Sequence, residues 1–269
     1  MTEEKVLQDN KTVEQIVDDM NLFDDDLMSM VFDGNIEAAG LLLKIVLKRD
    51  GIIIISVVGQ REFQSPVVGG RNIRLDILAK DNTGKYYNIE VQRKPEGAHI
   101  RRARFNSSMI DSRMLKEGQE FSELRDSYMV FITQTDIFGR GLPINTINRH
   151  FEEFDDGSHI VYVNGSYQGD DAVGKLMHDF GCKNSRDIYY PELAKGVKHF
   201  KEEEGGRKAM CEAVEKYAEK KVAVKVKEER SLMTQIVAAL VADKDDDTII
   251  KELNCTLEQI IPLRTVMGK

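Results

Sequence analysis

The segment from Arg74 to Lys94, RLDILAKDNTGKYYNIEVQRK, constrains the fold more than any other part of the chain. Two runs rich in β-branched and aromatic residues flank a short turn of Asp, Asn, Thr and Gly, which is the pattern of a β-hairpin. Successive side chains of a strand point to opposite faces. Folding the hairpin about Thr83 therefore collects apolar residues on one face and places Asp76 directly opposite Glu90.

The two faces of this hairpin differ in chemistry. The apolar face holds Ile73, Leu75, Ile77, Ala79, Tyr87, Ile89 and Val91, and the other face holds Arg74, Asp76, Asn88, Glu90 and Gln92. Two carboxylates about 5 Å apart, at an effective dielectric constant of about 20, repel by roughly 3 kcal/mol. A divalent cation (Mg²⁺, Mn²⁺ or Ca²⁺), a shared proton, Arg74 as a counter-ion or solvent screening would each offset this repulsion. Alternation by itself leaves these explanations open.

Neighbouring residues strengthen the metal-site interpretation. Glu37 falls in the first turn of a helix predicted to begin at Asn35, and Gln92 extends the polar row by one position. The densest basic stretch of the chain follows directly, and phosphate groups could be held there against a metal ion. Its basic residues are Arg93, Lys94, Arg101, Arg102 and Arg104.

Helical and strand patterns alternate around the hairpin. A strand preceded by a helix, and a helix between the hairpin and the next strand, predict a mixed central sheet flanked by helices, in the order αβββαβ. The predicted elements are a helix from Asn35 to Gly51, a strand Ile52–Val58 buried on both faces, a loop over 59–72, the hairpin, a helix His99–Leu115 and a strand Tyr128–Gln134.

Composition changes mark the predicted domains. Residues 1–27 read as a flexible acidic lead-in and 28–205 as the α/β domain, which also contains a strand His159–Tyr167 and a helix Asp171–Phe180. Residues 206–269 are rich in Lys, Glu, Ala and Val and predict a helical extension, which offers a surface for homo-oligomers. A helix-turn-helix in the last part is disfavoured because neither helix is basic.

The charge balance limits the classes of molecule that the protein can bind. A net charge of −8 over 269 residues excludes a general polyanion binder, so any nucleic-acid site must be a local basic patch. No apolar run is long enough for a membrane span, and the N-terminal residues lack a signal-peptide core, so a cytoplasmic location is expected. The spacing of His178 and Cys182 favours packing over zinc binding, because no second ligand pair accompanies them.

The chain resembles the PD-(D/E)XK nuclease superfamily, and more closely its recombination-promoting nuclease and transposase family. The segments that carry the resemblance are FDGNIEAAGLLLKIVL, the hairpin, RRARFNSSMID, VFITQTDIFGRGLPI and HIVYVNGSYQGDDAVGKLMHDF. Together they extend over roughly residues 24–205, and their order and length make the resemblance specific.

The resemblance implies a metal-dependent DNA endonuclease of low sequence specificity, linked to recombination or mobile DNA. Asp76 and Glu90 would bind Mg²⁺, Glu37 would be the acid of the first core helix, and Gln92 stands where most of the superfamily has lysine. The superfamily's proline is absent, because Leu75 precedes Asp76. The five basic residues after Gln92 would contact DNA.

Two alternatives use the same fold. The first is a DNA- or protein-binding module with a weak or inactive site, which the glutamine and the acidic net charge suggest. The second is a defence nuclease gated by a partner that docks on residues 207–269. Salt-dependent DNA binding without cleavage distinguishes the first, and unregulated activity after truncation distinguishes the second.

Overall fold

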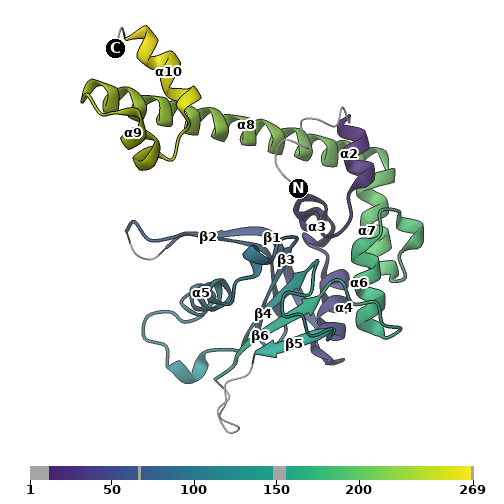
Figure 1. The fold of residues 1–269 in the computed structure, drawn as a ribbon. Coiled ribbons are helices and arrows are strands. Elements are labelled where there is room, and N and C mark those ends of the chain that lie inside the picture. Colours follow the sequence, from purple (N-terminus) through teal and green to yellow (C-terminus); the bar gives the residue numbers. More distant parts are fainter. Residues whose placement is uncertain (1–11, 66–67, 148–155, 268–269) are drawn as a thin grey trace. The chain divides into compact units, whose positions relative to one another are not determined.

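The computed structural model describes residues 12–65, 68–147 and 156–267 (Figure 1). The chain divides into two compact units, the first ending at Cys211 and the second beginning at Glu212. The first unit carries the sheet, and the second is helical over its described elements. The sequence-based limits of 28–205 and 206–269 stay a prediction.

The first unit is built on one mixed sheet of six strands in the order β1-β2-β3-β4-β6-β5. The tight turn makes β2 and β3 antiparallel, whereas the helical crossover through α5 brings β4 parallel beside β3. This confirms the predicted α/β core. The strands are β1 (Ile54–Phe63), β2 (Ile73–Asp81), β3 (Tyr86–Gln92), β4 (Ser127–Thr133), β5 (Ile144–Ile147) and β6 (Ser158–Asn164).

Helices cover both faces of this sheet. Figure 1 shows α5 on one face and α3, α4, α6 and α7 on the other, in agreement with the contacts between these elements. The helices of the first unit that precede α8 are α2 (Val13–Asp19), α3 (Asp25–Phe32), α4 (Ile36–Leu47), α5 (Ile100–Asp111), α6 (Ala172–Gly181) and α7 (Pro191–Glu202).

Local sequence explains where α4 begins and ends. The Asn35 side chain accepts the backbone N–H of Ala38 at 3.0 Å, which is the predicted N-cap. The helix ends at Leu47, where Lys48 adopts a left-handed conformation with φ 53°. The end therefore comes four residues before Gly51, because a non-glycine residue supplies the terminating backbone conformation.

Strand β1 departs from its prediction in length and burial. It begins two residues after Ile52 and continues through residues predicted as a loop, because Arg61, Glu62 and Phe63 pair with the first residues of β2. It is also an edge strand, and Ile55 and Val58 are 57% and 41% exposed. The run of β-branched residues predicted a strand buried on both faces. At the edge of the sheet, however, only some of these side chains are covered by other elements.

The hairpin has the predicted register, with Ile77 opposite Ile89 and Leu78 opposite Asn88. Its strict separation into two faces fails near Asp76. Leu75 packs beneath α5 in the same apolar cluster as Leu78, although one residue is odd and the other even. At the matching point of β1, Gln60 has a positive φ of 50°. Such irregular backbone bends a strand and re-aims its side chains.

The segment predicted as a flexible lead-in contains ordered helices among its described residues. Helix α2 begins with a capping box formed by Thr12 and Gln15. Helix α3 begins at Asp25, and Leu22 and Leu27 are fully buried. This part of the chain therefore contributes to the core of the first unit; residues 1–11 lie outside the described residues.

The helical end of the chain contains α8 (Glu204–Val241), α9 (Asp246–Leu253) and α10 (Leu257–Val266). A small core holds the last turns of α8 against α9 and α10, and the predicted capping box of Thr256 and Gln259 opens α10. The buried residues of this core are Ile236, Leu240, Ile249, Cys255 and Ile260. Over the described residues, no helix combines the length and apolar character of a membrane span.

Candidate active site

Asp76 and Glu90 meet where the two hairpin strands separate. Regular pairing of β2 with β3 extends from Lys80 to Ile77 and stops one residue before Asp76. There the Asp76 carboxylate reaches across and accepts the backbone N–H of Val91 at 3.0 Å. The side chain of Asp76 thus replaces a ladder hydrogen bond, which brings its carboxylate beside the strand that carries Glu90.

Glu90 is fully buried and its two carboxylate oxygens have different partners. Asn88 donates to one oxygen at 3.0 Å, and the Arg102 guanidinium donates to the other at 2.7 Å. Arg102 comes from α5, the helix that crosses over from β3 to β4. A buried carboxylate requires such partners, because desolvation disfavours its charged form.

The two acids perturb each other. Burial, followed by the charges of Glu90 and Asp25, raises the pKa of Asp76 to about 8. Burial also raises the pKa of Glu90, although the Arg102 guanidinium and the Asn88 amide oppose the rise. Near neutral pH the pair therefore retains a proton when no metal is bound.

The donor set suits a hard divalent cation. Two adjacent carboxylates provide the oxygen ligands that Mg²⁺, Mn²⁺ and Ca²⁺ prefer, and one guanidinium does not balance both charges. A dication would replace the proton that the pair otherwise retains. Asp76 and Glu90 would hold such an ion; Asp25 does not complete a three-acid group within 4.8 Å in the described part of the chain.

Gln92 lies at the end of β3, next to Arg102. Its side-chain oxygen accepts a long hydrogen bond of 3.4 Å from Arg102, which also donates to the Gly97 carbonyl at 3.0 Å. A Cβ atom on Gly97 would lie 1.9 Å from the Gln92 side-chain oxygen, so a side chain there would displace the Gln92 amide. The structure therefore unites Asp76, Glu90 and Gln92 as the sequence predicted.

Glu37 is not part of this cluster. It lies in the first turn of α4, is exposed, and lines a separate hollow with Lys44 and Lys195. Asp25 in α3 instead lies near the pair, because its charge raises the pKa of both Asp76 and Glu90. The missed signal was the helical spacing of Leu27, Met28, Val31 and Phe32 after the acidic run.

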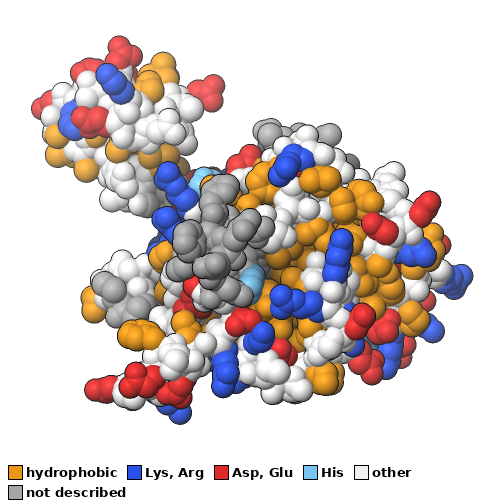
Figure 2. Space-filling model, turned by 90° about the horizontal axis from the view of Figure 1, so that it is seen from below, with side chains coloured by type: hydrophobic (Ala, Val, Ile, Leu, Met, Phe, Trp, Pro, Cys, Tyr) orange, Lys and Arg blue, Asp and Glu red, His pale blue; other side chains and the backbone are white. Residues whose placement is uncertain are grey.

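The predicted DNA-contacting residues divide into two groups. Arg102 points to Glu90, and Arg93 forms an ion pair with Asp24 at 2.8 Å, with 48% of the Arg93 side chain exposed. Lys94, Arg101 and Arg104 are exposed. On the face shown in Figure 2, Lys and Arg side chains are interspersed with Asp and Glu.

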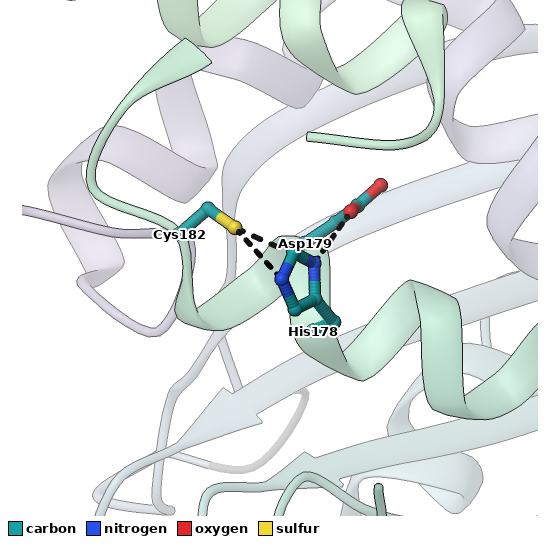
Figure 3. A group of neighbouring side chains, drawn as sticks. All are labelled: His178, Asp179 and Cys182. Carbon is teal, nitrogen blue, oxygen red and sulfur yellow. Dashed lines mark hydrogen bonds and ion pairs between the residues drawn. The ribbon is translucent and has the colours of Figure 1, made fainter. Parts of the chain in front are cut away.

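A second group of possible metal ligands lies at the end of α6 (Figure 3). It comprises His178, Asp179 and Cys182, whose ligand atoms lie within 4.8 Å of one another. Cys182 Sγ is 3.5 Å from His178 Nδ1 and 3.8 Å from Nε2, so the sulfur lies beside the ring and not along a nitrogen lone pair.

The remaining contacts of this group are structural. The Asp179 carboxylate is fully buried and accepts the backbone N–H groups of Tyr189 and Tyr190 at 2.8 and 2.9 Å. Burial raises the pKa of the Cys182 thiol to about 11, which disfavours the thiolate needed for zinc. These contacts favour packing, as the sequence predicted.

Residues 35–164 match the family of PD-(D/E)XK nuclease family transposases. The matched segment begins at the N-cap of α4 and ends with β6, so it contains the whole sheet and the Asp76–Glu90 pair. Comparisons with curated proteins and with solved structures find no match. The match confirms the resemblance read from the sequence motifs: residues 35–164 are similar to the PD-(D/E)XK nuclease family transposases.

Proposed function

We propose that the protein is a Mg²⁺-dependent DNA endonuclease of low sequence specificity, acting in the cytoplasm in recombination or on mobile DNA. The observation that carries the proposal is the Asp76–Glu90 pair, in which Glu90 is fully buried and Asp76 half-buried, inside the segment that matches a nuclease family. The match to this family supports a nuclease-like or mobile-DNA function in general. The metal, the substrate and the activity itself belong to the proposal.

Each residue of the site has a proposed role. Asp76 and Glu90 hold the dication, which when bound would activate water and neutralise charge on the phosphate. Gln92 orients the attacking water, because its amide offers donors as well as an acceptor. Lys94, Arg101 and Arg104 contact the phosphates on either side of the scissile bond, and Arg93 joins them if it leaves Asp24.

The test is cleavage of supercoiled plasmid by the full chain in a series of Mg²⁺, Mn²⁺ and Ca²⁺, with EDTA as the metal-free reference. Wild-type protein is expected to nick or degrade the plasmid, and Asp76→Ala to lose this activity without loss of fold. Asp170→Ala, on an exposed loop, is the matched control and should cleave normally. Intact plasmid after long incubation with each metal would refute the proposal.

A binding module with a weak site is the second candidate. Two observations favour it: neutral Gln92 at the position of the usual lysine, and the ion pair that engages Glu90 with Arg102. Salt-dependent DNA binding without cleavage in any metal would identify this function. Gln92→Lys, measured in the same assay, shows whether a positive charge on β3 increases the activity.

A further inference from the structure

Arg102 is placed differently from the other basic residues that follow the hairpin. Its side chain turns inward from the first turn of α5 and contacts both Glu90 and Gln92, while 37% of the side chain remains exposed. We propose that Arg102 supplies from α5 the positive charge for which the motif usually has a lysine on β3. This inference rests on the proposed nuclease function.

The guanidinium is held in one orientation by several partners. One terminal nitrogen donates to Glu90 at 2.7 Å, and the other donates to the Gly97 carbonyl at 3.0 Å and to Gln92 at 3.4 Å. A planar guanidinium that donates hydrogen bonds from both terminal nitrogens has little freedom to rotate. The exposed part of the side chain leaves room for a phosphate oxygen on its open side.

The backbone before α5 creates the space for this fork. A 3₁₀ turn, Pro95–Ala98, leads from β3 into the helix, and His99 caps the helix through a 3.1 Å hydrogen bond to the Arg101 N–H. Gly97 lies in this turn and leaves the space that the Gln92 amide occupies beside Arg102. The turn therefore places the Arg102 guanidinium beside the Gln92 side chain, at the position where the motif usually has a lysine.

Arg102 also has the electrostatic environment that this role requires. Its charge acts on both carboxylates of the pair and favours their ionised forms. The neighbouring Arg101 and Arg104 are exposed on the outer side of α5. The helix turns Arg102 toward the sheet instead, along with Ala103 and Asn106, which are buried.

The test removes the positive charge of Arg102 from α5 and introduces one at position 92 on β3. Single-turnover cleavage at saturating DNA is compared for wild type, Arg102→Ala, Gln92→Lys and the double variant Gln92→Lys/Arg102→Ala. Arg102→Ala is expected to reduce the rate about 100-fold, the loss typical of one preorganised charge or donor. The double variant should recover to within about tenfold of wild type, because lysine on β3 restores the charge.

Lys116→Ala is the control, because it removes an exposed positive charge just beyond the end of α5 and outside the proposed site. It should leave the rate at saturating DNA within about twofold of wild type. Thermal unfolding of every variant checks that the fold is intact. If Arg102→Ala does not fold, Arg102→Lys and the double variant replace it, and the double variant must still cleave.

Two results would overturn the inference alone: a cleaving wild type with an equally active Arg102→Ala, or a folded double variant that gains nothing while Gln92→Lys alone is active. A wild type that leaves DNA intact in every metal overturns the proposed function and this role together. Recovery in the double variant supports a role of charge, because a merely structural role of Arg102 would not be restored by lysine on another strand.

Discussion

Asp76→Asn should abolish the loss of stability with rising pH that the Asp76 carboxyl contributes. Burial and the charge of Glu90 raise the pKa of Asp76 to about 8, whereas an aspartate in the unfolded chain titrates near 4. Between these values the folded state binds a proton that the unfolded state has lost. The free energy of unfolding therefore falls as pH rises, by up to about 1.4 kcal/mol per pH unit.

Urea unfolding in EDTA, at about pH 5.5 and about pH 7.5, measures this effect. Over these two pH units, wild type should lose up to roughly 2.7 kcal/mol that Asp76→Asn does not lose. Asparagine has no such proton, and its side-chain oxygen can still accept the N–H of Val91. At the higher pH the variant should therefore be the more stable protein when no metal is present.

Asp170→Asn, on the exposed surface, is the control and should follow wild type at both pH values. Because Glu90 titrates together with Asp76, the difference between wild type and variant is the informative quantity. Parallel pH dependence of wild type and Asp76→Asn would refute the reasoning. So would a wild type that gains stability over the variant as the pH rises.

Three further outcomes are expected. At about pH 7.5, millimolar Mn²⁺ or Mg²⁺ should raise the melting temperature of wild type in differential scanning fluorimetry but not that of Asp76→Asn, because only a site with both carboxylates binds the ion. Gly165→Ala should destabilise by about 1–3 kcal/mol in urea unfolding, since its Cβ would lie 2.5 Å from the Thr133 carbonyl. Gly181→Ala has open space and is its near-neutral control. Lys201→Met should cost about 1–3 kcal/mol by the same measurement, because three backbone carbonyls lose their ammonium donor; an unchanged unfolding midpoint would contradict this.

The core of the fold was predictable because its signals are local. The turn residues around Thr83 and the alternation on either side defined the hairpin and its register. Asn35 predicted the start of α4, and the helical pattern between Gln92 and Tyr128 predicted a parallel neighbour for β3. β5 was missed, since a strand of four residues is too short to show a period.

The candidate site was predictable in part. The hairpin register predicted that Asp76 and Glu90 would be neighbours, although the regular ladder ends at Ile77 and the Asp76 side chain completes the approach. Glu37 was assigned from its place in a helix, but that helix presents it to solvent. Asp25 was missed because an acidic composition suggested a flexible segment, although apolar residues at helical spacing follow it.

By itself, the sequence determined the hairpin, the order of its neighbouring elements and the identity of the two opposed acids, because turn chemistry and side-chain alternation act over a few residues. Only the tertiary structure decided that Glu90 is fully buried, that Asp25 adds its charge to the pair, and that Arg102 rather than Arg101 or Arg104 faces Glu90. These properties depend on how α3 and α5 pack on opposite faces of the sheet, and desolvation and charge coupling arise from that packing between segments far apart in the chain.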